Sequence, residues 1–307
     1  MPKIKMQTAL CPSFEDAFER FIIAKKAKGL SSKSIATYEN HYNAISKYIE
    51  PETQMDKLSK ADIEYMLAGM RDKGLAANSI ASYTRTLRSF LSWAHEEELT
   101  TVSCKQYKAE ETVKDTYTDS ELARLLKKPN IHKCTFSEYR NWVMINMLLN
   151  CGMRAATMRS ILVKDVNLQN QTIIYRHTKN KSIQIAPLCS EMVCILREYL
   201  KLRQGNVDDV LFPSDENTKF TESGLYQAIA KYNHSRGVTK TSTHLFRHTY
   251  AERFLQNGGS PFELQKILGH STLTMTRKYC RIYDYDIVRK YDSVSPLATF
   301  RAGSSNN

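Results

Sequence analysis

The sequence predicts a mainly α-helical protein of two domains, with a small β-sheet confined to the second domain. A chain of 307 residues is long enough to build two separate cores. Apolar residues in the first hundred positions recur at a 3-4-3-4 spacing, which is typical of one face of an α-helix. Short β-branched runs occur only after residue 170, so the sheet belongs to the second half.

The first domain, residues 12–100, is predicted to contain two helical hairpins that form a four-helix unit. One apolar face consists of Ile35, Tyr38, Tyr42, Ile45 and Ile49. The string GLSSKSIATY returns 45 residues later as GLAANSIASY. In each copy a glycine, Gly29 or Gly74, is expected to close one helix, and small polar residues are expected to start the next.

A polar, charged stretch, residues 101–116, interrupts the periodicity and is the expected interdomain linker. The second domain, residues 117–282, opens with Thr118 and Glu121 at the spacing of a helix capping box. A strongly apolar helix then ends at Gly152.

Two short runs, QTIIYRH and SIQIAPL, predict a β-hairpin with Lys179, Asn180 and Lys181 at its turn. The run DVLFPS suits either a brief third strand or an extended loop. Helices resume after it, and Ser260 with Pro261 fits the start of one of them. The second domain is therefore expected to be mixed α/β, with more helix than sheet.

The charge balance favours a polyanionic partner. Lysine and arginine number 44 against 32 acidic residues, which gives a net charge of +12 and a pI near 9.3. None of the seven cysteines forms a Cys-x-x-Cys pair, so we expect reduced thiols in a cytoplasmic protein, with no metal and no cofactor. Neither a signal peptide nor an apolar run of 18 residues is present, which argues against a membrane location.

Two arginines, two histidines and a tyrosine supply groups that can attack a phosphodiester without a metal. Arg154 directly follows the helix-ending Cys-Gly-Met, and His244 precedes Arg247 by three residues, which places both on one helical face. His270 follows Leu-Gly, and Tyr279 comes nine residues later. Guanidinium groups bind phosphate through paired donors and stay charged at working pH.

Each of these residues has an expected role. Tyr279 is the candidate nucleophile, although a phenol with a pKa near 10 needs help in losing its proton. The two arginines would offset the charge of the transition state. His244 is a candidate general base or hydrogen-bond donor, and His270 would orient the phosphate or the tyrosine.

Other basic residues are given simpler roles. His248, beside Arg247, is expected to point to another helical face and to act in packing, and Arg159 and Arg253 are interpreted as surface residues. Candidate phosphate contacts in the first domain are Lys25, Lys26, Lys28, Lys33, Arg85 and Arg88.

The motifs NCGMR, HLFRHTYA and ILGHSTLTMTRKY together resemble the tyrosine recombinase (phage integrase) family. The resemblance implies an N-terminal core-binding, SAM-like domain that clamps DNA, followed by the catalytic domain. It also implies that a lysine on the hairpin protonates the 5′-oxygen leaving group. Lys179 is the first choice for this acid and Lys181 the second. Thr157 departs from the family pattern, which usually has an acidic residue at that position.

The resemblance further implies site-specific recombination through a 3′-phosphotyrosyl intermediate and a Holliday junction. The implied partners are double-stranded DNA recombination sites, further copies of the chain in a homo-tetramer, and accessory DNA-bending or directionality factors. A helix in the tail, residues 283–307, would either dock in cis or pass to a neighbouring protomer.

The biological role has two main alternatives. The ending KYDSVSPLATF resembles the tails of mobile-element integrases, and we expect a compact type without an arm-binding domain. A Xer-type enzyme that resolves chromosome or plasmid dimers is the other choice. Outside recombination, the alternatives are a non-catalytic DNA-binding protein, a metal-dependent nuclease and a type IB topoisomerase.

Overall fold

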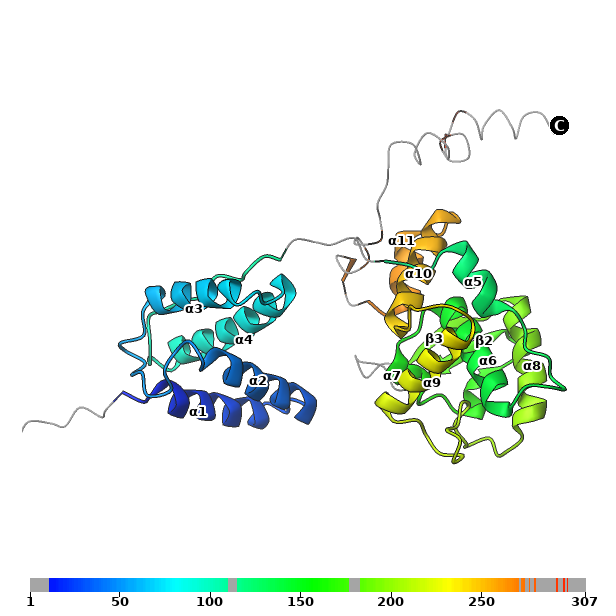
Figure 1. Ribbon diagram of the computed structural model, residues 1–307, viewed down its shortest axis with the longest axis horizontal. Coiled ribbons are helices and arrows are strands. Elements are labelled where there is room, and N and C mark those ends of the chain that lie inside the picture. Colours follow the sequence, from blue (N-terminus) through cyan, green and yellow to red (C-terminus); the bar gives the residue numbers. More distant parts are fainter. Residues whose placement is uncertain are drawn as a thin grey trace, which may run out of the picture. The chain divides into compact units, whose positions relative to one another are not determined.

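The computed structural model describes residues 11–109, 115–176, 183–270 and single positions between 272 and 297. Lys179, Lys181 and most of the predicted tail helix lie outside these described residues. The chain divides into two compact units, residues 1–113 and 114–307 (Figure 1). None of the helices in the described part is long and apolar enough to cross a membrane.

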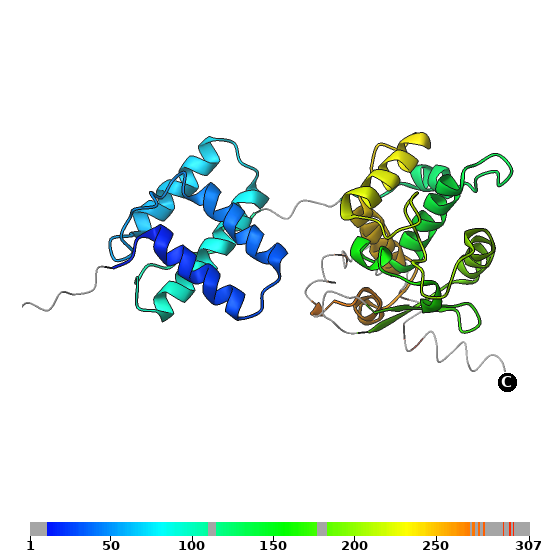
Figure 2. The same cartoon turned by 90° about the horizontal axis from the view of Figure 1, so that it is seen from below.

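The first unit consists of four helices in its described part, shown in blue to cyan in Figures 1 and 2. They are α1 (Phe14–Ala27), α2 (Ser32–Ile45), α3 (Lys60–Asp72) and α4 (Ala77–Glu96). The longest, α4, contacts each of the other three. Its buried face therefore organises the core of this unit.

Aromatic rings join α1 to α4. Phe90 lies in the centre, with its ring centroid 5.4 Å from Phe14, 5.3 Å from Phe18 and 5.5 Å from Phe21. Full burial of one such side chain is worth about 1.5–3 kcal/mol. The apolar periodicity of these helices thus becomes a single aromatic core.

The two copies of the repeated sequence adopt the same backbone turn. Gly29 and Gly74 have φ values of +74° and +70°, in the left-handed region that favours glycine. After Gly29, the side chain of Ser31 caps α2 as expected. The corresponding residue before α4 is Ala76, which makes no side-chain cap, so the expected polar start is wrong for the second copy.

The second unit is mixed α/β. Its described helices are α5 (Asp119–Leu126), α6 (Phe136–Cys151), α7 (Ala155–Met158), the 3-10 turn η1 (Val163–Asp165), α8 (Ser190–Arg203), α9 (Glu222–Ser235), α10 (Thr243–Gln256) and α11 (Pro261–Leu268). Helix α6 contacts α5, α8, α9 and α10 (Figure 1), which explains why it is apolar on nearly every side. The predicted capping box at Thr118 is present, and Ser260 caps α11 with Pro261 in its first turn as predicted, with an additional capping box to Glu263.

A small antiparallel sheet lies beside these helices, in the order β1-β2-β3. Strands β2 (Thr172–Tyr175) and β3 (Gln184–Pro187) form the predicted hairpin. The third strand is β1 (Val166–Asn167). The run DVLFPS is an extended loop, linked to Leu162 by a single bridge at Val210. The predicted fold class, mainly helical with a small sheet, is confirmed.

Gly152 ends α6 at a crowded point. Its φ is +56°, and a Cβ atom there would lie 2.4 Å from Tyr250 Cδ1 and 2.9 Å from Leu268 Cδ2. No side chain fits this space unless the side chains of Tyr250 and Leu268 shift. The glycine therefore lets three helices meet just before Arg154.

We expect Gly152→Ala to destabilise the second unit more than Gly237→Ala. Both substitutions place alanine at a positive φ, which costs about 1–2 kcal/mol, but nothing lies within 4 Å of the Gly237 position. Crowding at Gly152 should add about 1–3 kcal/mol. Urea unfolding of the two variants measures the difference, and equal losses would contradict the crowding argument.

Candidate active site

Arg247 is a buried cation that ties together the ends of two helices. Its side chain extends from α10 and is only 6% exposed. Nη1 donates to the carbonyl oxygen of Gly152 at 2.8 Å, and Nη2 donates to that of Leu268 at 2.8 Å. Helix ends leave such carbonyls without partners, so the guanidinium satisfies both and is itself compensated for burial. Burial lowers the pKa of Arg247 to about 10, with Arg154 adding to the effect, so the group stays charged at neutral pH.

His270 holds the same guanidinium from the other side. Gly269 ends α11 with a φ of +62°, which turns the chain toward Arg247. His270 Nε2 lies 2.9 Å from Arg247 Nη2 and must accept, because a guanidinium only donates. The ring proton is therefore on Nδ1, which lies 2.9 Å from the Thr276 hydroxyl. Burial, Arg247 and Arg154 lower the pKa of His270 to about 4, so it is neutral at pH 7.

The β2–β3 hairpin is attached to this helix end as well. Gln184 Nε2 donates to the carbonyl oxygen of Lys266 at 3.1 Å and also to that of Ile267. A Cβ atom on Gly269 would lie 2.5 Å from Gln184 Oε1. The last turn of α11 therefore packs directly against β3.

Tyr279 lies in this cluster with its hydroxyl 2.8 Å from His248 Nδ1. Its ring is nearly parallel to that of His270, at 10° and a centroid distance of 6.5 Å. Burial raises the pKa of Tyr279, whereas the nearby Arg247 and Arg154 act in the opposite direction. The phenol is thus protonated at rest, but the charges around it favour its anion.

Arg154 supplies the second positive charge. It occupies the N-cap position of α7 in an extended conformation, two residues after Gly152. Burial lowers its pKa, and the Tyr279 oxygen counteracts this effect. Thr157, at the position where the family pattern has an acid, is buried and uncharged.

The structure brings together four of the six predicted site residues: Arg154, Arg247, His270 and Tyr279. His244 lies on the exposed first turn of α10, with its backbone N–H capped by the Ser242 hydroxyl. His244 and Arg247 are one helical turn apart on α10. This face of the helix therefore runs from solvent at His244 to the protein interior at Arg247. Lys179, the sixth, lies outside the described residues.

The expectation that His248 acts only in packing is wrong. Adjacent helix residues point about 100° apart, so the sequence predicts that His248 and Arg247 lie on different faces of α10. The phenol of Tyr279, however, meets α10 at His248, and the arginines act on it through space. The i, i+4 spacing from His244 to His248 was the sequence feature that placed both on one face.

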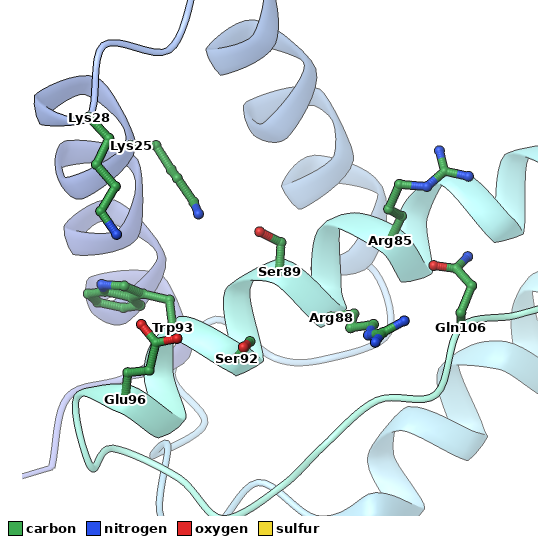
Figure 3. Close-up of a pocket in the computed structure, with 9 residues that line it drawn as sticks. All are labelled: Lys25, Lys28, Arg85, Arg88, Ser89, Ser92, Trp93, Glu96 and Gln106. Atoms are coloured by element: carbon green, nitrogen blue, oxygen red, sulfur yellow. The ribbon is translucent and has the colours of Figure 1, made fainter. Parts of the chain in front are cut away.

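A second candidate site lies on the first unit, where α1 and α4 form a basic pocket of about 380 Å³. Figure 3 shows its lining residues: Lys25, Lys28, Arg85, Arg88, Ser89, Ser92, Trp93, Glu96 and Gln106. Four of the six candidate phosphate contacts are among them. Of the other two, Lys26 lies 4.0 Å from Glu39 and Lys33 is in the first turn of α2. This pocket is the candidate nucleic-acid surface of the unit.

Stability should depend on pH through His270. Its folded-state pKa of about 4 lies below the ordinary value of 6.5, so between these values only the unfolded chain takes up the proton. The stabilisation is complete above pH 6.5 and falls as the pH drops toward 4. Urea midpoints at pH 7.5 and 5.0 should differ less in His270→Gln than in the wild type. His132→Gln, in an exposed loop, should keep the wild-type difference, and an equal difference in all three proteins would refute the assignment.

Known proteins match both units. The model of the phage integrase family matches residues 116–285, more than half of the chain. The model of the phage integrase N-terminal SAM-like domain matches residues 16–98. Tyrosine recombinases XerD from Staphylococcus saprophyticus subsp. saprophyticus and Staphylococcus haemolyticus are each 28% identical over 283 residues, which cover 88% of this chain and 95% of theirs.

Solved structures share the fold. The Tn1549 transposon integrase in complex with transposon right end DNA gives a TM-score of 0.77 at 18% identity, covering 92% of this chain and 100% of that one. A lambda integrase tetramer bound to a Holliday junction gives 0.70 at 16% identity, covering 89% and 80%. The chain thus belongs to the phage integrase family of tyrosine recombinases, enzymes that cleave and rejoin DNA.

Proposed function

We propose that Tyr279 is the nucleophile of this site-specific recombinase and that it forms a 3′-phosphotyrosyl link with duplex DNA. The observation that carries the proposal is the cluster in which Tyr279 lies beside His270 and within the field of Arg247 and Arg154. Two guanidinium groups provide the charge that a pentacoordinate phosphorus requires. The ester keeps the energy of the broken bond, so rejoining needs no ATP.

The remaining residues have supporting roles in this proposal. His270 fixes the position of Arg247 through its Nε2 atom. His244, at the solvent-exposed start of α10, would donate a hydrogen bond to a phosphate oxygen once DNA is bound. Lys179 is proposed as the acid that protonates the 5′-oxygen, on the strength of the family motif, with Lys181 as the alternative.

The proposed partner is a pair of duplex recombination sites, exchanged through a Holliday junction by four copies of the chain. The similar integrases, one solved in complex with transposon right end DNA and one as a tetramer bound to a Holliday junction, support this assembly. The basic pocket of α1 and α4 would contact the DNA backbone and supply affinity that falls steeply with salt.

For the biological role, we propose Xer-type resolution of dimers rather than integration of a mobile element. The support is the pair of XerD relatives that match 95% of their length. Sequencing of DNA trapped covalently on the protein in its host cells separates the two roles. Resolution predicts one chromosomal or plasmid locus, whereas integration predicts the ends of a mobile element and would replace this proposal.

Tyr279→Phe should abolish the covalent complex with a nicked suicide substrate while leaving DNA binding intact, because only the attacking oxygen is removed. Denaturing gels detect the complex, and peptide mapping of the wild-type complex identifies the linked tyrosine. Tyr283→Phe is the sequence-matched control and should react normally.

The same assay separates the alternative functions. A linkage to another tyrosine, or no linkage at all, would overturn the proposed nucleophile. Cleavage that is lost in EDTA would indicate a metal-dependent nuclease. Relaxation of any supercoiled plasmid would indicate a topoisomerase.

Arg247→Lys should reduce the rate of single-turnover cleavage by about 10²–10³-fold, the usual cost of losing one oxyanion donor. A lysine is a point charge and cannot serve Gly152, Leu268 and a phosphate together. Arg253→Lys is the matched control on the same helix, because Arg253 pairs at the surface with Asp119. Equal rates for the two variants would exclude Arg247 from the chemistry.

A further inference from the structure

We infer that His248 is the general base that takes the proton from Tyr279 as the phenol attacks DNA. The inference rests on the proposed role of Tyr279 as the nucleophile. His248 Nδ1 lies 2.8 Å from the Tyr279 hydroxyl, within the reach required for direct proton transfer. The two ring centroids are 5.4 Å apart at an angle of 42°.

His244, the general-base candidate from the sequence, lies on the exposed first turn of α10, whereas the hydroxyl of Tyr279 contacts His248. The other groups near the phenol are unsuited to the task. Arg154 and Arg247 are cations and cannot accept a proton. His270 uses Nε2 to accept from Arg247 and directs its Nδ1 proton at Thr276. A neutral imidazole that carries its proton on Nε2 leaves Nδ1 as an acceptor, and this is the state in which His248 can take the phenolic proton across the 2.8 Å contact.

The surrounding charges explain when the transfer would occur. Arg247 is adjacent to His248 on α10, and both Arg247 and Arg154 act on the phenol that His248 contacts. Positive charges close to an imidazole disfavour its protonated form. His270, after α11, is neutral at pH 7. Glu252 follows one turn later on the same face of α10 and favours the imidazolium. A DNA phosphate brings negative charge between the two arginines. It therefore offsets their effect on His248 at the moment when the imidazole becomes positively charged.

The step balances in both directions. In cleavage, the bond from the Tyr279 oxygen to phosphorus forms, the bond from phosphorus to the 5′-oxygen breaks, and the phenolic proton moves to His248 Nδ1. The 5′-oxygen receives a different proton, from the lysine acid. In rejoining, the 5′-hydroxyl gives its proton back to the lysine and forms the bond to phosphorus, the bond from phosphorus to the Tyr279 oxygen breaks, and His248 returns its proton to the departing phenolate.

His248→Gln and His248→Ala test the inference in single-turnover cleavage of a suicide substrate between pH 5.5 and 9. Glutamine can hold the phenol through a hydrogen bond but cannot accept its proton. Both variants should therefore lose about 10²–10⁴-fold in rate, keep DNA binding, and lose the rise in rate with pH that the wild type shows. His132→Ala, on an exposed loop, should behave as the wild type.

A substrate with sulfur in place of the 5′-bridging oxygen shows which proton transfer a variant has lost. A thiolate leaves without an acid, so this substrate restores the rate only where protonation of the leaving group was lost. It should rescue Lys179→Ala and leave both His248 variants slow. Rescue of the His248 variants would place His248 on the leaving-group side and overturn the inference. A wild-type rate in His248→Gln would mean that His248 only positions Tyr279. Faster cleavage would mean that the hydrogen bond from His248 holds Tyr279 inactive in the free enzyme, and either result would overturn the inference.

Nitrogen-15 NMR of the wild-type protein provides a second measurement that needs no variant to fold. At pH 7.5 the His248 ring should be neutral, with its proton on Nε2; a proton on Nδ1 would overturn the inference. The covalent linkage separates this inference from the proposed function. If DNA is linked to Tyr279 but His248→Gln reacts at the normal rate, only the general-base role of His248 is overturned. If DNA is linked to another tyrosine, the proposed nucleophile and the proposed base are both overturned.

Discussion

The buried guanidinium of Arg247 is the constraint on which the active site depends. It joins the last carbonyl groups of two helices to the ring of His270, so one charged group sets the positions of Gly152, Leu268 and His270 together. A charge at this depth is tolerated only because each contact compensates part of its lost hydration. The packing of these helix ends in the second unit and the position of the Arg247 guanidinium are consequently coupled.

The same site holds two neighbouring positive charges, and a DNA phosphate would supply negative charge to balance them. Arg154 adds to the lowering of the pKa of Arg247, and the buried Thr157 of α7 carries no charge. Two cations that repel each other bind a bridging anion more strongly than either does alone. Under the proposed function a backbone phosphate would complete the site, which would link the chemistry to the presence of the duplex.

The sequence predicted those features that depend on local interactions. The capping box at Thr118, the helix start at Ser260 and the helix end at Gly152 are set within a few residues, and the motifs identified the residues that gather around Tyr279. The errors concern features that residue types and spacing do not fix, such as the start of α4 at Ala76, which lacks a side-chain cap. The strand at Val166–Asn167 depends on pairing with β2, and the role of His248 depends on where the chain after α11 crosses α10.

The contact of Gln184 with the end of α11 has a mechanical consequence. The hairpin whose connecting segment contains Lys179 is fastened by one amide to the turn that presents His270. If Lys179 is the acid, a neighbouring subunit or a mismatched duplex that pulls the hairpin aside also loosens the arginine clamp. Under that proposal, displacing the hairpin would disable the acid and the arginine site together. The enzyme would then not cut a strand that it could not reseal.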